Sequence, residues 1–207
     1  MQASLVRTVT ELALRQDGAV TRHQLHRLGV SAKSIATAVR GGWLAPADNG
    51  VLVLAATPDT WRRRLRVGLL ALDARGWVSH HAAAALYGWP APAEPVEFTV
   101  PRAARGLRAA GVVHTTGVVA PGDVRTVAGL RCSSPTRTLL DLAHAGAPLP
   151  HLRACLAAGE RAGLTSAAAV TERLADGRGA GHWGTPPLDR LVADGSTGPR
   201  RLHPVAA

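Results

Sequence analysis

Apolar residues recur along this chain at spacings that alternate between helical and extended, and each change of spacing predicts a new element. Residues 2–16 carry apolar side chains at helical spacing and end at Asp17-Gly18, which predicts one amphipathic helix. Two shorter helices are predicted next, one between Thr21 and Gly29 and one that starts at Ser31. Each begins at a hydroxyl residue that can cap it and ends at glycine.

The first short helix has a well-defined start, because Thr21 and Gln24 have the spacing of a capping box. After the second helix, residues 43–54 contain two apolar runs around Asn49-Gly50, a strong hairpin signal. A hairpin directly after two short helices is the outline of a winged helix-turn-helix. Residues 19–54 therefore predict this DNA-binding arrangement.

The second short helix has one apolar face, formed by Ala32, Ile35 and Val39. The opposite face carries the side chains that we predict to enter a DNA major groove: Lys33, Ser34, Thr37 and Arg40. Phosphate contacts are predicted for cationic side chains on neighbouring helices: Arg22, His23, Arg62, Arg63 and Arg66. Capped helices with a polar face also occur in domains that bind no nucleic acid. For the arginines Arg62, Arg63 and Arg66, a basic helix face exposed to solvent stays an alternative.

The rest of the chain predicts a second, mixed unit. We expect a helix from a Thr57 cap to about Arg75 and a short helix that is capped by Ser79. Strands and helices follow at residues 95–101, 111–116, 123–127, 130–133, from Ser134-Pro135, 149–162 and 166–175. The expected fold class is α+β: a winged helix-turn-helix domain at 1–56, a small mixed α/β domain at 57–175, and a Gly/Pro-rich flexible tail at 176–207.

Composition supports a nucleic-acid partner without proving it. The 207 residues carry a net charge of +10, and Lys33 is the single lysine among 24 basic residues. Arginine suits phosphate and guanine, but a chain rich in Ala, Gly and Pro also follows from GC-rich coding DNA. Two cysteines are too few for a disulfide framework, which favours a reduced, cytoplasmic setting. Neither a signal peptide nor a membrane-spanning run is present, so we expect no membrane association.

No catalytic or metal-binding motif is found, and we expect no enzyme activity, cofactor or metal. Adjacent helical residues point about 100° apart, so His80-His81 is not expected to chelate an ion, and His80 is predicted to pack near its cap. Asp141 is expected to pair with Arg137, four residues earlier, rather than act as a buried catalytic acid. Cys132 and His114 are residue types that could form a catalytic nucleophile pair, but nothing else in the sequence supports such a pair.

Several short motifs in order resemble the AbiEi-type antitoxins of type IV toxin–antitoxin systems. The N-terminal run GAVTRHQLHRLGVSAKSIATAVRGGWL, followed by GVLVLA, resembles the winged-helix domain of these proteins. The runs TWRRRLRVGLLALDARGWVSHHAAAALYGW, VEFTVPR, GVVHTT and VAGLRCSSPTRTLLDLA resemble longer members from GC-rich actinobacteria. Many longer members carry a C-terminal domain similar to very-short-patch-repair endonucleases. That domain would begin where the Gly/Pro-rich tail lies, so we expect no nuclease activity.

The resemblance implies a DNA-binding transcriptional regulator that autoregulates its own operon, with double-stranded DNA and a cognate toxin as partners. Members usually have a basic residue or histidine before the hairpin glycine and a tyrosine two positions after it. Asn49 and Leu52 occupy these positions here, beside the acidic Asp48. Two alternatives stay open: a toxin-neutralising protein-interaction module with little specific DNA binding, and an enzyme-like relative of nucleases or nucleotidyl transferases. The sequence does not give an oligomeric state.

Overall fold

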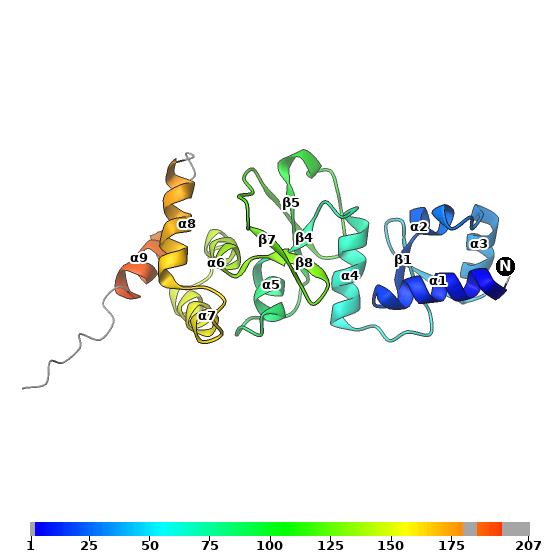
Figure 1. Ribbon diagram of the computed structural model, residues 1–207, viewed down its shortest axis with the longest axis horizontal. Helices are drawn as coiled ribbons and strands as arrows, with labels where there is room; N and C mark the ends of the chain where they lie inside the picture. The colour runs from blue at the N-terminus through cyan, green and yellow to red at the C-terminus, as the bar shows by residue number, and fades with distance from the viewer. Residues whose placement is uncertain (1–2, 180–185, 196–207) are drawn as a thin grey trace, which may run out of the picture.

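The computed structural model describes residues 3–179 and 186–195, which form an elongated body (Figure 1). A three-stranded sheet near the N-terminus and a five-stranded sheet in the middle are combined with helices α1 to α9 within these residues. This architecture confirms the expected α+β class. In Figure 1 the N-terminal unit lies at one end, α4 lies between the two sheets, and α6 to α9 lie at the other end.

The N-terminal unit contains three helices and a small antiparallel sheet of strand order β1-β3-β2. Its elements are α1 (Ala3–Arg15), β1 (Ala19–Thr21), α2 (Arg22–Arg27), α3 (Ala32–Arg40), β2 (Leu44–Asp48) and β3 (Val51–Leu54). The capping box is confirmed, because the Thr21 hydroxyl accepts from the Gln24 backbone N–H and the Gln24 side chain accepts from the Thr21 backbone N–H. The Ser31 hydroxyl likewise caps α3.

All four residues of β3 are buried because the small sheet is covered on both faces. On one face Leu52 and Leu54 pack with the helices α1 to α3, around Ile35. On the other face Val51 and Val53 pack against Val67 of α4. The continuous apolar run Val51–Leu54 therefore reflects a central strand between two layers, and not a hairpin arm with one side in water.

Helix α4 spans Trp61–Ala71 and is shorter than predicted. The predicted cap at Thr57 is wrong, because the Thr60 hydroxyl accepts the Arg63 backbone N–H at 3.1 Å. Thr57 is used elsewhere: its hydroxyl donates to the Leu54 carbonyl at 2.7 Å. Besides Val67, α4 contributes Leu65 and Leu69 to the core beneath the five-stranded sheet. This helix thus packs on both sheets, directly after the predicted domain boundary.

The second sheet has the strand order β6-β5-β4-β8-β7. Its strands are β4 (Trp77–Val78), β5 (Glu97–Pro101), β6 (Val112–Thr116), β7 (Val124–Val127) and β8 (Leu130–Ser133), with a 3-10 turn η1 (Arg102–Ala104) after β5. β4 runs parallel to β8 and antiparallel to β5, whereas β6 runs parallel to β5 and β7 forms a hairpin with β8. Gly68 lets α4 approach this sheet closely, since a Cβ at that position would lie 2.2 Å from the Phe98 ring.

Helices α5 (His80–Leu86), α6 (Pro135–His144), α7 (Leu149–Arg161), α8 (Ala167–Gly179) and α9 (Pro186–Gly195) complete the second unit. A flexible tail from residue 176 was expected, and this is wrong for α9, whose side chains Leu188 and Leu191 lie inside the core formed by α6 to α8. The remaining tail residues, 180–185 and 196–207, lie outside the described part. Among the described residues, every helix is too short or too polar to cross a lipid bilayer.

Candidate functional site

Helix α3 presents one exposed polar face and buries the other. Ile35 is fully buried, whereas Lys33, Thr37 and Arg40 are exposed along the opposite side. These side chains are ordered by local bonds: Arg40 donates to the Thr37 hydroxyl at 3.3 Å, and that hydroxyl donates to the Lys33 carbonyl at 3.0 Å. Ser34, half-buried in the first turn, accepts a hydrogen bond from the Ser31 hydroxyl at 3.0 Å. Within the described residues, neither Lys33 nor Arg40 forms an ion pair.

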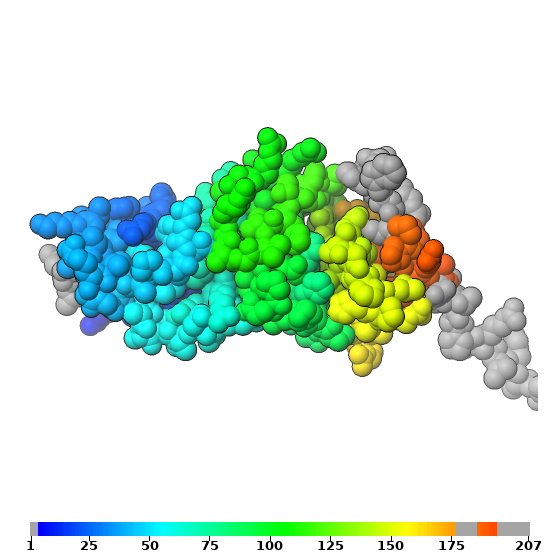
Figure 2. Space-filling view, turned by 180° about the vertical axis from the view of Figure 1, so that it is seen from behind, coloured from blue at the N-terminus to red at the C-terminus, as the bar shows by residue number. Residues whose placement is uncertain are grey.

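The first turn of α2 adds two exposed cationic or titratable side chains, Arg22 and His23. Both precede α3 in a unit whose helices α2 and α3 pack on one another through Leu25 and Ile35. Arginine near a helix N-terminus is opposed by the helix dipole, and an anion bound there would offset that repulsion. Figure 2 shows this unit as the blue end of the molecular surface, which continues into the cyan and green parts of the chain.

The arginines of α4 lie in a different environment from the one predicted. Asp17, which follows α1, accepts from Arg62 at 2.7 Å and from Arg66 at 3.0 Å. Arg63 donates to the Thr57 carbonyl at 2.6 Å and pairs with Asp59 at 3.4 Å. Arg62 and Arg66 therefore join α4 to the N-terminal unit, whereas Arg63 holds the segment that leads into α4. Phosphate binding by these three arginines stays a prediction.

The tip of the β2–β3 hairpin also turns inward. The Asp48 carboxylate accepts a hydrogen bond at 2.6 Å from the backbone N–H of Ala110, which belongs to the second unit. Its other oxygen accepts the Asn49 backbone N–H at 2.7 Å, inside the hairpin turn. Asp48 thus fastens the hairpin to the loop before β6.

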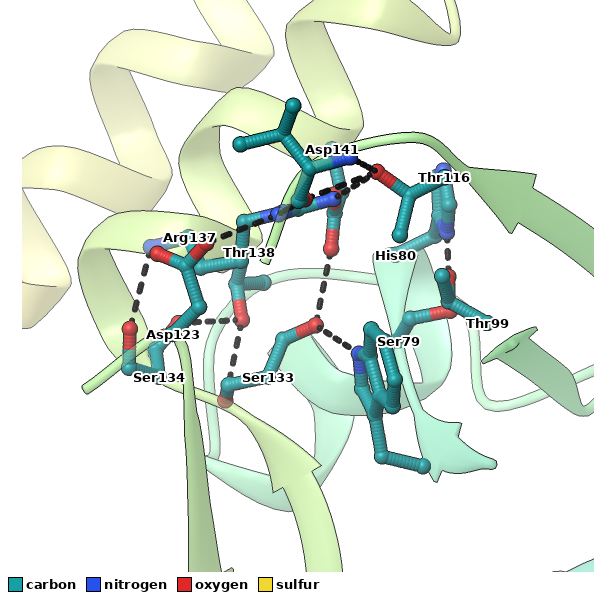
Figure 3. A network of polar contacts seen from close by, with 12 residues as sticks. Ser79, His80, Thr99, Thr116, Asp123, Ser133, Ser134, Arg137, Thr138 and Asp141 are labelled. Atoms are coloured by element: carbon teal, nitrogen blue, oxygen red, sulfur yellow. Dashed lines mark hydrogen bonds and ion pairs between the residues drawn. The ribbon is translucent and has the colours of Figure 1, made fainter. Parts of the chain in front are cut away.

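A buried polar network lies where the parallel strands β4 and β8 end (Figure 3). Because parallel strands end at the same edge of a sheet, Ser79 after β4 and Ser133 at the end of β8 come close to one another. Ser133 donates to the Asp141 carboxylate at 2.7 Å and accepts the Trp77 indole N–H at 3.2 Å. Ser79 accepts the Thr99 hydroxyl at 2.8 Å.

Arg137 is the cation of this network. It donates to Asp141 at 2.7 Å, which confirms the predicted pair, and to Asp123 at 2.9 Å. Burial would raise the pKa of Asp123, but hydrogen bonds from Arg173 and from the Ala120 backbone N–H lower it below its ordinary value. Since both carboxylates are engaged by arginine, the network stabilises the fold and offers no free catalytic acid.

A second polar cluster lies at the neighbouring edge of the sheet, and sequence reasoning missed it. Glu97 and Thr99 point to the same face of β5, and β6 places His114 opposite Thr99. The His114 Nε2 atom lies 3.3 Å from Glu97 Oε1, and the His80 ring stacks on the His114 ring with centroids 3.7 Å apart. The sequence signal for this cluster was the alternation of the polar residues Glu97 and Thr99 along β5. That alternation identifies a polar cluster only when it is known that β6, with His114, pairs beside β5.

The protonation of this cluster follows from burial and hydrogen bonding. Burial lowers the pKa of His80 to about 4, so its ring is neutral near pH 7, and its Nδ1 atom lies 2.9 Å from the Ser79 hydroxyl. This confirms His80 as a hydrogen-bonded packing residue beside Ser79. The predicted cap at Ser79 is wrong in one respect: Ser79 is the N-cap residue of α5, but its side chain makes no cap hydrogen bond. Burial acts to raise the pKa of Glu97, yet hydrogen bonds from His114 and the His81 backbone N–H lower it.

The conceivable nucleophile pair Cys132/His114 is not assembled. Cys132 lies on β8 and His114 on β6, with β5 and β4 between them. Neighbouring strands lie about 4.8 Å apart, so the two side chains are separated by roughly three strand spacings. Burial also raises the pKa of the Cys132 thiol to about 12, which leaves no thiolate for catalysis.

Comparisons with known proteins give the fold but no family. No family model matches the chain, and no curated protein matches it. A solved structure, the RV2827C protein from Mycobacterium tuberculosis, is similar with a TM-score of 0.59 and 17% sequence identity. The likeness covers 94% of this chain and 78% of that chain, so both units take part in it. We conclude that the chain has the same overall architecture as this mycobacterial protein.

Proposed function

We propose that the protein is a DNA-binding transcriptional regulator whose N-terminal unit acts as a winged helix-turn-helix. The observation that carries this proposal is the exposed face of α3, where Lys33, Thr37 and Arg40 lie opposite a fully buried Ile35. A helix of this kind can enter a major groove, where arginine and lysine bind guanine and where short polar side chains bind either base edges or phosphates.

The two exposed residues at the start of α2, Arg22 and His23, support the same interface as phosphate contacts. We leave the arginines of α4 out of the proposed interface, because they are paired with Asp17 and Asp59. The interface is therefore smaller than the sequence predicted and is confined to α2 and α3. The resemblance to AbiEi-type antitoxins adds the proposal that the protein binds its own operator.

The test is binding of the full-length chain to its own upstream DNA and to a scrambled duplex, across a salt series. Preference for the upstream duplex at physiological salt is expected of a sequence-specific regulator. Lys33→Ala and Arg40→Ala are each expected to weaken binding by about 1–3 kcal/mol if the contact is to a base. Arg161→Ala on α7 is the matched control, because it removes the same charge far from α3.

Unchanged binding in the Lys33→Ala/Arg40→Ala double variant would contradict the role of α3. Equal and steeply salt-dependent binding to both duplexes would show phosphate contact alone. A stoichiometric protein partner that co-purifies without any DNA binding would replace the proposal with a protein-interaction function.

A further inference from the structure

Two histidines and a glutamate from three different elements converge at one point in the second unit. His80 begins α5, Glu97 begins β5, and His114 lies on β6, the edge strand of the sheet. One ring nitrogen of each histidine and one carboxylate oxygen lie within 4.8 Å of one another. We propose that these three side chains bind a divalent transition-metal ion, with Zn²⁺ as the best fit, at a site separate from the α3 face.

The spacing of the three groups suits a tetrahedral ion. Zinc binds imidazole nitrogen at about 2.0–2.1 Å, so two ligand atoms on one tetrahedron lie roughly 3.3 Å apart. His114 Nε2 and Glu97 Oε1 are 3.3 Å apart, which is longer than most N–H···O hydrogen bonds. The His80 and His114 rings are stacked with centroids 3.7 Å apart, so the two rings must splay apart to direct one nitrogen each at the same ion.

Two of the three proposed ligands, His80 and Glu97, are held in place by hydrogen bonds to their other polar atoms. The His80 Nδ1 atom lies 2.9 Å from the Ser79 hydroxyl, which can accept a hydrogen bond from Nδ1–H and leave Nε2 for a metal. Glu97 Oε2 accepts the His81 backbone N–H at 2.7 Å and lies 3.1 Å from His81 Nδ1. This contact leaves Oε1 directed at the two imidazoles. Such outer hydrogen bonds are what orient the ligands of protein metal sites.

The site is reachable from solvent and its backbone is strained. The His114 side chain is 30% exposed and the Glu97 side chain 10% exposed, so an ion can enter past the β6 edge. His80 has a φ of +52°, in the left-handed region that costs free energy for residues other than glycine. This conformation turns the first residue of α5 back over the sheet, beside His114. Two imidazoles and one carboxylate favour zinc or cobalt over calcium or magnesium, which prefer oxygen ligands.

The experiment is titration of the untagged, full-length protein with ZnSO₄ by calorimetry and with CoCl₂ by visible spectroscopy. We expect one ion per chain, and Co²⁺ bands of a nitrogen/oxygen site without a thiolate charge-transfer band. His114→Ala and Glu97→Gln are each expected to weaken binding by about 10-fold or more. His144→Ala, an exposed histidine at the end of α6, is the matched control and should leave binding unchanged.

Absence of stoichiometric binding, or binding that persists in both variants, would overturn the proposal. Far-ultraviolet circular dichroism in EDTA checks that each variant is folded. If either variant fails to fold, crystals of the unaltered protein soaked in ZnSO₄ decide the question. An anomalous peak about 2.0–2.1 Å from a ring nitrogen of both His80 and His114 is expected, and a peak only elsewhere would be contradictory.

Discussion

At the scale of one residue, Arg137 shows how this fold accommodates a buried positive charge. Its guanidinium lies between the buried carboxylates of Asp123 and Asp141 and also donates to the Thr116 hydroxyl and the Val118 carbonyl. A buried ion pair is costly to form, but removal of one partner is costlier still because it leaves an uncompensated charge. A single substitution at Arg137 should therefore lower the stability of the whole second unit.

We expect Arg137→Met to lower the free energy of unfolding by about 3–5 kcal/mol, because two buried carboxylates then lose their shared cation. Urea unfolding followed by circular dichroism measures this effect. Arg161→Met on α7 is the matched control, since that side chain is exposed and, within the described part of the chain, forms one hydrogen bond, to the Ala157 carbonyl. A loss equal in the two variants would contradict a special role for Arg137.

Acid should weaken the same network through Asp123, whose folded pKa is lowered mainly by its hydrogen bonds. A carboxyl with a lowered folded pKa contributes stability above its unfolded pKa, about 3.9, and loses it as the pH falls through the folded value. Stability should therefore decrease below about pH 4. Asp123→Asn should be less stable at pH 7 and should lose less on acidification, as measured by thermal unfolding across pH 2–7. Parallel curves for both proteins would contradict this reading.

At the scale of elements, Asp17 joins α1 to α4. Its carboxylate accepts from both Arg62 and Arg66, one helical turn apart, and its backbone has a left-handed φ of +56°. Asn tolerates this backbone region, so Asp17→Asn removes the charge and little else. The contact is a charged hydrogen bond between half-buried groups, so the loss should be about 1–2 kcal/mol.

Thermal unfolding of Asp17→Asn measures that loss, and Asp59→Asn is its control. Asp59 also accepts from two arginines of α4, but it lies in solvent, where ion pairs contribute little. We expect the control to melt near the unaltered protein. A larger loss in Asp59→Asn than in Asp17→Asn would mean that the α1–α4 contact does not stabilise the junction.

Local signals predicted most of the elements because a helix cap is a contact within a few residues. The capping box at Thr21 and the hydroxyl caps at Ser31 and Ser134 form as the sequence indicates. The predicted cap at Thr57 fails because its hydroxyl is already engaged by two near neighbours in the chain, the Leu54 carbonyl and the Arg63 guanidinium. Sequence spacing alone does not rank it below Thr60.

Contacts between residues far apart in the sequence limited which sites could be predicted. The exposed α3 face was predictable because one helix carries it. The histidine cluster was not, because it requires β6 to pair beside β5 in the register that places His114 next to Thr99. The ion pairs of Arg62 and Arg66 similarly depend on Asp17, more than forty residues earlier in the chain. Arginine composition indicates charge but does not indicate the partner.

For the whole molecule, α4 and α9 decide how far the two units depend on one another. Figure 1 shows the layers in line, from the N-terminal unit through α4 and the five-stranded sheet to α9. α4 contributes to the cores on both of its sides, through Val67 on one and Leu65 on the other. Leu188 of α9 is fully buried in the core at the opposite end. Continuous packing of this kind predicts that the described parts unfold together.

We expect Leu188→Ala to destabilise the protein by about 2–5 kcal/mol, because it opens a cavity in the α6–α9 core. Leu14→Ala on α1 is the matched control, since Leu14 is 58% exposed and leaves no cavity. Hydrogen exchange read by mass spectrometry then tests the coupling. If α4 links the cores, peptides from α2 and α3 lose protection together with those from α7. Unchanged protection in α2 and α3 would mean that the N-terminal unit folds independently, and that α4 covers its sheet without transmitting stability.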